Sequence, residues 1–219
     1  MRTSRLFIVA VSAMLVSASA FADTFQLGAN GDQCPVGFTG CGPMSGGGTG
    51  SPIASSLTFA GSTVSFTATA TNAQGAIHVI QDVGSTGAGL GAQISAFDNA
   101  SGADSDNLNF GERLLLHFSK QVALFGWGFR LDSHTAPGSG SGNFSLSVNG
   151  GGPLTYALNS SAPGAPLIGQ DFTFAYSGTS YYLGSLSARV SEVPEPSTYG
   201  LLAIGLAMLG FIARRRNRG

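Results

Sequence analysis

The chain has 219 residues, of which 33 are glycine and only 10% are charged. This length suits one domain with flanking signals, and the low charge excludes charge-rich disorder. Between residues 23 and 195, four basic and eleven acidic residues give a net charge of −7, which excludes a nucleic-acid-binding protein because phosphate binding needs a basic surface.

Residues 1–22 have the features of a secretory signal peptide. Two arginines precede an apolar run at 6–16 that is too short to span a bilayer. Ala20-Phe21-Ala22 then forms an A-x-A-like cleavage site, and Ala18-Ser19-Ala20 is the alternative site. We therefore expect export through the Sec translocon, removal of the leader by signal peptidase, and a mature chain that begins at Asp23.

Residues 23–52 are expected to form a disulfide loop followed by a glycine-rich segment. Cys34 and Cys41 enclose six residues, and an exported chain meets the oxidising conditions in which disulfides persist. We predict that the two cysteines form a structural disulfide, and a pair of free thiols is the alternative. The run at 42–50 has the low complexity of a flexible segment.

The region 53–192 has the pattern of an all-β domain. Apolar and polar residues alternate in short runs that glycine-rich turns separate, and no run shows a convincing period of 3.6 residues. The predicted strands lie at 62–70, 76–83, 114–118, 122–131, 144–148, 154–158, 172–176 and 181–190. Many short strands of this kind favour a single β-sandwich, jelly-roll-like in type.

The densest acidic group comprises Asp98, Asp104, Asp106 and Glu112, and it precedes a predicted buried strand. Ca²⁺ takes several oxygen ligands from flexible loops, so these four residues are the candidate metal ligands. Their spacing does not match an EF-hand, and a solvated acidic loop is the alternative. No other cofactor is expected.

The sequence does not favour an enzyme. The histidines are His78, His117 and His134, and Asp132 precedes His134 closely enough to orient its imidazole. Serine is so common in this chain that a Ser-His-Asp combination is expected by chance. Such a combination is therefore no evidence for a catalytic triad. No G-x-S-x-G or H-E-x-x-H motif is present, so a secreted hydrolase is the less favoured class.

The last part of the chain, 193–219, begins with a rigid segment and ends in a basic cluster. Pro194 and Pro196 hold the backbone extended, and the uncharged run at 199–213 then predicts a helix. Its length of roughly 22 Å is below the ~30 Å of a bilayer core, and terminal arginines extend the span by snorkelling. We therefore expect a transmembrane helix at about 199–213. Its cytoplasmic stop-transfer cluster is Arg214, Arg215, Arg216 and Arg218.

The motif at the start of this segment is Val193-Pro194-Glu195-Pro196-Ser197-Thr198. Together with the short apolar helix and the arginine cluster, it resembles the PEP-CTERM sorting signal of exported bacterial proteins. The same tail is also labelled an ice-binding protein C-terminal domain. The resemblance covers only 193–219, and it implies processing near the motif by an exosortase, a membrane-embedded cysteine protease-transpeptidase. It also implies a host that makes exopolysaccharide and biofilm.

We therefore expect an exported precursor that is anchored in the inner membrane and is then sorted to the cell surface or the extracellular space. Its expected role is that of a surface or matrix component without catalysis, linked to exopolysaccharide. The alternative is a β-sandwich module that binds calcium or carbohydrate. The candidates for stacking on sugar rings are Trp127, Tyr156, Tyr176, Tyr181 and Tyr182, and packing in the core is the alternative role of these rings.

Overall fold

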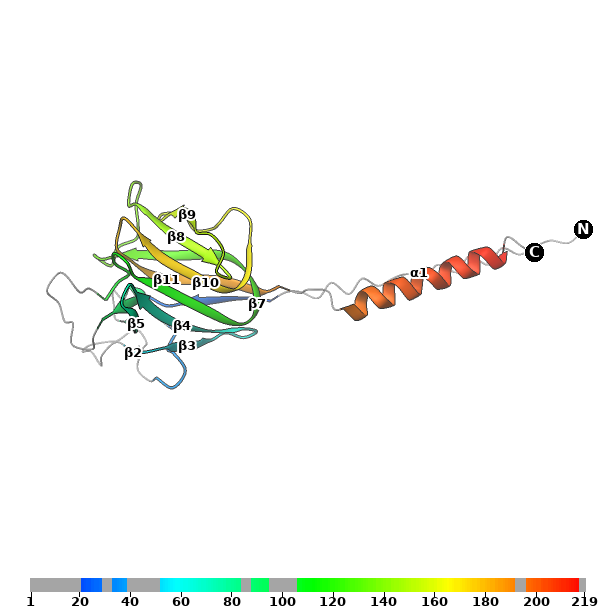
Figure 1. Ribbon diagram of the computed structural model, residues 1–219, viewed down its shortest axis with the longest axis horizontal. Helices are drawn as coiled ribbons and strands as arrows, with labels where there is room; N and C mark the ends of the chain where they lie inside the picture. The colour runs from blue at the N-terminus through cyan, green and yellow to red at the C-terminus, as the bar shows by residue number, and fades with distance from the viewer. Residues whose placement is uncertain are drawn as a thin grey trace, which may run out of the picture.

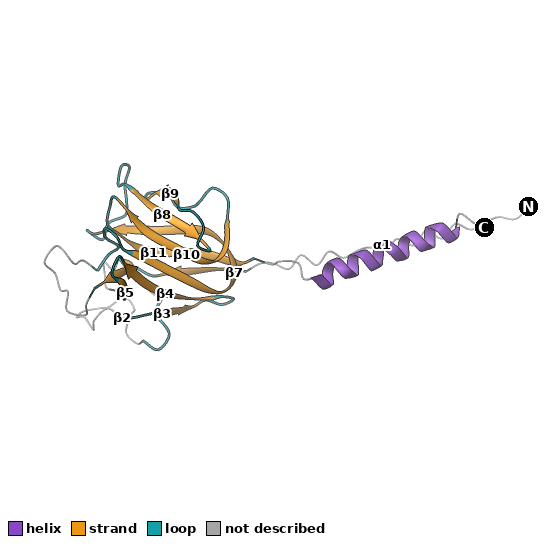
Figure 2. Ribbon diagram, viewed as in Figure 1, coloured by secondary structure: helices purple, strands orange, loops and turns teal. Residues whose placement is uncertain are grey.

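The computed structural model describes residues 21–28, 33–38, 52–83, 88–94, 106–191 and 196–216. Strands form the domain, and one helix follows them (Figures 1 and 2). The elements are β1 (Ala22–Gln26), β2 (Ile53–Ala54), β3 (Leu57–Ala60), β4 (Ser65–Asn72), β5 (Gly75–Asp82), β6 (Gly89–Gln93), β7 (Arg113–Leu131), β8 (Asn143–Val148), β9 (Leu154–Ala157), β10 (Leu167–Ser177), β11 (Tyr181–Val190) and α1 (Pro196–Arg216). The all-β character predicted from the alternating pattern is confirmed.

The described strands belong to one eleven-stranded sheet, in the order β1-β11-β6-β5-β4-β7-β10-β8-β9, with β2 on β5 and β3 on β4. β11 also pairs with β7, so that β4, β5, β6, β11 and β7 form a closed ring. β10, β8 and β9 extend the sheet from this ring. The predicted sandwich is not confirmed, because the pairing in the described part of the chain joins all strands into one continuous sheet.

The length of β7 explains why the sheet is continuous. We predicted two strands, at 114–118 and 122–131, but the chain continues through both as one strand of 19 residues. Its first part pairs with β4 and its second part pairs with β11, while β10 pairs with both. The polar residues at 119–121 lie exposed at the bend between the two parts. Alternation alone does not distinguish such a bend from a loop.

The same alternation decides which side chains enter the core. In β4, Phe66, Ala68 and Ala70 are buried, whereas the threonines between them are half-buried. The ring of Phe66 lies edge-on to Phe25 of β1, with 4.8 Å between the ring centroids. It also contacts Phe118 of β7 at 5.4 Å. Such aromatic pairs contribute about 0.5–1.5 kcal/mol beyond their burial, so they hold β1 against the ring of strands.

Both ends of the β domain lie in one place, which we call the terminal pole. It comprises residues 22–23, 61–64, 119–121 and 189–191. Ala22 of β1 pairs with Arg189 of β11, and the backbone N–H of Ser191 donates to the carbonyl of Gln121 at 2.9 Å. The first and last strands of the domain are therefore neighbours, and β11 ends there, just before the tail (Figure 1).

Candidate functional site

The C-terminal segment is the first candidate site. α1 begins at Pro196, the second proline of the predicted motif, and ends at Arg216. Proline suits the first turn of a helix because its missing N–H would have no partner there. The arginines in the last turn are favourable at the negative end of the helix dipole. The helix predicted at 199–213 is confirmed, and it extends further at both ends.

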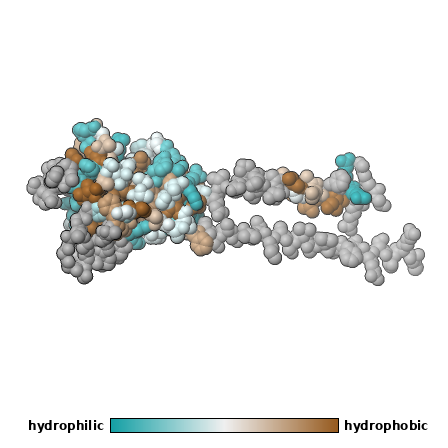
Figure 3. All heavy atoms as spheres, turned by 90° about the horizontal axis from the view of Figure 1, so that it is seen from below, coloured by the Kyte–Doolittle hydropathy of each residue, from teal (hydrophilic) through white to brown (hydrophobic). Residues whose placement is uncertain are grey.

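The described side chains of α1 are exposed, including five large apolar ones that are 56–64% exposed (Figure 3). These are Ile204, Leu206, Met208, Leu209 and Ile212. Among the described residues, no helix combines the length and the apolar character needed to cross a membrane. The transmembrane prediction for 199–213 is therefore not confirmed. This uncharged run is shorter than the roughly 20 apolar residues of a typical spanning helix, and it includes three glycines.

The sorting motif lies close to the folded domain along the chain. Ser197 and Thr198 are in the first turn of α1, whereas Val193, Pro194 and Glu195 lie outside the described residues, as does Arg218. On the domain side, the last described residue before the motif is Ser191. Its backbone N–H donates a hydrogen bond to the carbonyl of Gln121, at the bend of β7. Any enzyme that acts on the motif therefore works within a few residues of the terminal pole.

A comparison with family models matches residues 192–216 to the PEP-CTERM protein-sorting motif. The tail of this chain is therefore a PEP-CTERM protein-sorting motif. The PEP-CTERM motif implies an exported chain that is targeted to exosortase and processed at the membrane. No curated protein and no solved structure matches the chain. The PEP-CTERM match covers the tail, so the activity of the β domain has to be argued from its own residues.

Two of the four predicted calcium ligands, Asp98 and Asp104, lie outside the described residues. Glu112 is buried, and its carboxylate accepts the backbone N–H of Asn109 at 2.7 Å, which stabilises the turn before β7. Within the described ranges, no three His, Cys, Asp or Glu side chains form a group that could hold a metal ion. Calcium binding at the acidic loop therefore stays a prediction.

The fourth predicted ligand, Asp106, belongs to a polar cluster that sequence reasoning missed. It accepts a hydrogen bond from the hydroxyl of Tyr182, near the end of β11 opposite the terminal pole. The ring of His134 lies edge-on to Tyr182, with 5.6 Å between centroids. Nε2 of His134 is 3.3 Å from Oδ2 of Asp82. Two strands and two loops that are far apart in the sequence build this cluster, so no local motif marks it.

Burial dominates the electrostatics of this cluster. It raises the pKa of the Asp82 carboxyl; His134 opposes this effect and the negative charge of Asp106 adds to it. Burial, together with the hydrogen bond to Asp106, also raises the pKa of the Tyr182 hydroxyl far above its usual range. Tyr182 therefore stays protonated and acts as a hydrogen-bond donor.

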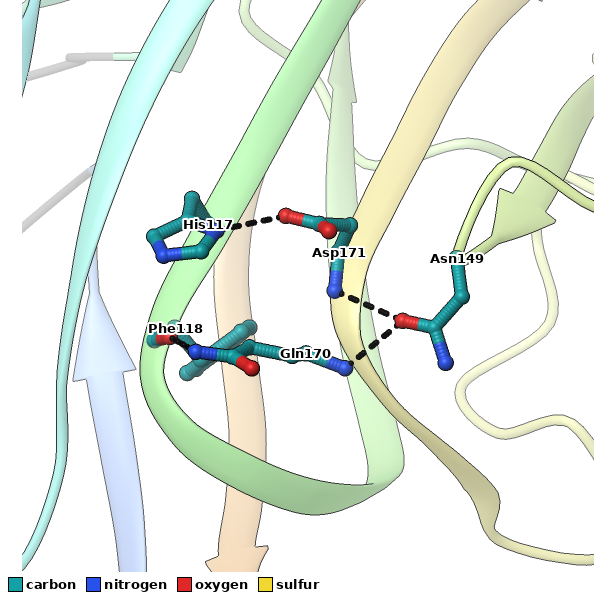
Figure 4. Close-up of polar contacts among 5 residues, drawn as sticks. All are labelled: His117, Phe118, Asn149, Gln170 and Asp171. Atoms are coloured by element: carbon teal, nitrogen blue, oxygen red, sulfur yellow. Dashed lines mark hydrogen bonds and ion pairs between the residues drawn. The ribbon is translucent and has the colours of Figure 1, made fainter.

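The side chains of His117 and Asp171 are within hydrogen-bond distance, with 2.6 Å between Nδ1 and Oδ1 (Figure 4). Their side chains are 56% and 42% exposed. Beside this pair, Oδ1 of Asn149 accepts the backbone N–H groups of Gln170 and Asp171 at 2.9 and 3.0 Å. Nε2 of Gln170 donates to the carbonyl of Phe118 at 2.9 Å. These contacts hold β10 at its register shift, so the network supports the fold locally.

Most of the predicted sugar-stacking residues lie in the core. Trp127, Tyr181 and Tyr182 are 4%, 0% and 1% exposed, so core packing, the alternative role, is the one found for these three. Phe110, in contrast, is 88% exposed, and its ring lies edge-on to Tyr176 with 6.0 Å between centroids. The sequence did not reveal Phe110, because one phenylalanine in a loop has no period that would show its exposure.

Two further predictions fall partly outside the described residues. Cys34 is half-buried in the described segment 33–38, but Cys41 is not described, so the disulfide stays a prediction. The proposed signal peptide lies outside the described residues except for Phe21 and Ala22. Removal of the leader therefore stays a prediction from the sequence alone.

Proposed function

We propose that the β domain is a component of the cell surface or extracellular matrix that acts without catalysis and is linked to exopolysaccharide. The PEP-CTERM motif at 192–216 carries this proposal, because it marks the chain as an exported substrate of exosortase. The closed interior of the domain supports a structural role. Its core is filled by apolar and aromatic side chains that are almost all fully buried.

The candidate acid–base groups also favour a role without catalysis. The His117–Asp171 pair is about half exposed, so bulk water surrounds it. Catalytic groups depend on a site from which water is excluded, because exclusion strengthens their electrostatic interactions. The other pair, His134–Asp82, is packed against Tyr182. A secreted hydrolase therefore remains the less favoured class.

The decisive experiment is the intact mass of the mature protein from its native host. We expect the wild type to end near Pro196, and the double variant Pro194→Ala/Glu195→Ala to retain the tail. Pro163→Ala/Pro166→Ala in the loop before β10 is the matched control and should be processed normally. Retention of the arginine cluster in the mature wild-type protein would contradict processing at the motif.

A carbohydrate-binding role is the second candidate, and the exposure of Phe110 favours it. Its ring offers a flat apolar face on which a sugar ring can stack, as aromatic side chains with an accessible face do. We expect Phe110→Ala to weaken co-sedimentation of the mature protein with exopolysaccharide from the host. Ile168→Ala is the control, because Ile168 is also exposed, at 56%, but is not aromatic. Equal binding of both variants and the wild type would remove this candidate.

A further inference from the structure

The buried carboxylate of Asp23 attaches β1 to the turn between β3 and β4. It accepts hydrogen bonds from the backbone N–H groups of Ser62, Thr63 and Val64 at 2.8–2.9 Å. The hydroxyl groups of Ser62 and Thr63 also donate to it. A Cβ atom on Gly61 would lie 2.7 Å from Cγ of Asp23, so glycine is needed for this close approach. Five donors from one turn therefore converge on the first residue of the expected mature chain.

This attachment has a consequence for the peptide bond between Ala22 and Asp23. A protease binds the residues on both sides of the bond that it cuts as an extended, separate segment. In the folded domain, Ala22 is paired with Arg189, and Asp23 is only 4% exposed. Phe21, one residue earlier, is 72% exposed. Docking of β1 therefore protects the Ala22–Asp23 bond in the folded domain.

The partner strand of β1 is the last strand of the domain. β1 pairs with β11 from Ala22↔Arg189 to Gln26↔Ser185. Because synthesis proceeds from the N-terminus, β11 becomes available only after the other strands. β1 consequently remains open for most of the time during which the chain is made and exported, and it closes when the segment just before the sorting motif has arrived.

We propose that β1 is a latch that closes last. Water hydrolyses the Ala22–Asp23 bond while the latch is open, leaving a carboxylate on Ala22 and an α-amino group on Asp23. Docking of Asp23 against Ser62, Thr63 and Val64 then makes this position inaccessible. The leader is thus removed before the fold is complete. The fold is completed when the C-terminal tail has been delivered. The inference concerns N-terminal processing and does not depend on the proposed function.

The test uses the full-length precursor, purified in detergent and incubated with a bacterial signal peptidase, with the cut sites read from intact mass. We expect cleavage after Ala22 to be at least about tenfold slower in the folded precursor than in the urea-unfolded one. Ser62→Ala/Thr63→Ala removes two of the five donors and leaves the cleavage site unchanged. It should therefore raise the rate in the folded state by about tenfold. Ser145→Ala/Thr155→Ala, on paired residues of β8 and β9, is the matched control and should cleave as slowly as the wild type.

Fluorescence of the buried Trp127 shows whether each variant is folded, and the comparison of folded with unfolded wild type needs no variant. Cleavage of the folded precursor after Ala20 instead of Ala22 would support the latch, because docking of β1 protects the Ala22–Asp23 bond. Equal rates of cleavage after Ala22 in the folded and unfolded wild type would overturn it. Failure of the unfolded chain to be cut after Ala22 would also overturn it.

Discussion

His134, in the loop after β7, contacts Asp82 at the end of β5, with 3.3 Å between Nε2 and Oδ2. The backbone of His134 adopts φ 61°, which is unusual for a residue with a side chain. The contact with Asp82 and the packing against Tyr182 both hold the ring in this position. The loop after β7 is therefore fixed to β5 and β11 through one imidazole.

We predict that Asp82→Asn stabilises the protein at neutral pH. Burial raises the pKa of Asp82 in the folded state, so folding favours the protonated carboxyl. This contribution to stability is fully present below the unfolded pKa of about 3.9 and is lost as the pH rises through the folded pKa. Urea unfolding between pH 4 and pH 8 should show that the unfolding free energy of the variant, relative to that of the wild type, increases as the pH rises. A wild type that is more stable than the variant at pH 7 would mean that the His134 contact outweighs burial.

We predict the opposite pH dependence for Asp23. Burial opposes its ionisation, but hydrogen bonds from Ser62 and Thr63 outweigh burial and hold its pKa well below the usual range. Its contribution is therefore present above about pH 3.9 and is lost as the pH falls towards the folded pKa. Asp23→Asn should cost about 2–5 kcal/mol of unfolding free energy at pH 7, because the amide keeps one acceptor oxygen and its NH2 group faces donors that bonded the second oxygen. Unfolding of the mature protein in urea, followed through Trp127, should show this difference shrinking below pH 4.

The sequence predicted several of the strands in which buried and exposed residues alternate. The range 181–190 coincides with β11, and 144–148 differs from β8 by one residue. β6 was not predicted, because its sequence GLGAQ is buried throughout and has no alternation. β1 was not predicted either; it lies in the segment that we expected to precede the domain, and its burial depends on β11 at the other end of the chain.

The sorting motif and the polar contacts of the β domain also differ in how well the sequence predicts them. The sorting motif was found from the sequence because its parts follow one another along the chain and act through local chemistry. The contacts of Asp23 join residues about 40 positions apart, and those between Tyr182 and Asp106 join residues 76 apart. Such contacts depend on strand order, which short-range patterns do not specify. The Asp132–His134 spacing suggested an oriented imidazole, but it gave no indication of Asp82.

We predict that Asn149 contributes to stability in two separable ways. Its φ of 50° disfavours residues with a Cβ, and its Oδ1 accepts two backbone N–H groups of β10. Asn149→Ala should cost about 2–3 kcal/mol, and Asn149→Gly should cost less because glycine tolerates this backbone conformation. His117→Ala on the neighbouring exposed pair should cost less than about 1 kcal/mol. Urea unfolding of the three variants tests this order, and equal losses for Ala and Gly would show that the backbone conformation is not strained.

We predict that Gly91→Ala disrupts the end of the domain opposite the terminal pole. A Cβ atom there would lie 1.8 Å from the carbonyl oxygen of Asp106 and 2.9 Å from Cα of Asn107. Both are backbone atoms, so the segment that carries Asp106 and Leu108 would have to move. The backbone N–H of Leu108 donates to Tyr181 at 2.8 Å, and this bond would be strained as well. A cost above about 3 kcal/mol is expected for overpacking against backbone.

The matched control for Gly91 is Gly138→Ala, because no atom lies within 4 Å of a Cβ at Gly138. It should be neutral, or stabilising by up to about 1 kcal/mol through the unfolded state. Thermal unfolding of the two mature proteins measures the contrast directly. Because the sorting motif is separate from this part of the domain, chains with Gly91→Ala that survive export should still be cut near Pro196. A Gly91→Ala protein as stable as the Gly138→Ala control would show that the 106–108 segment is not packed against β6.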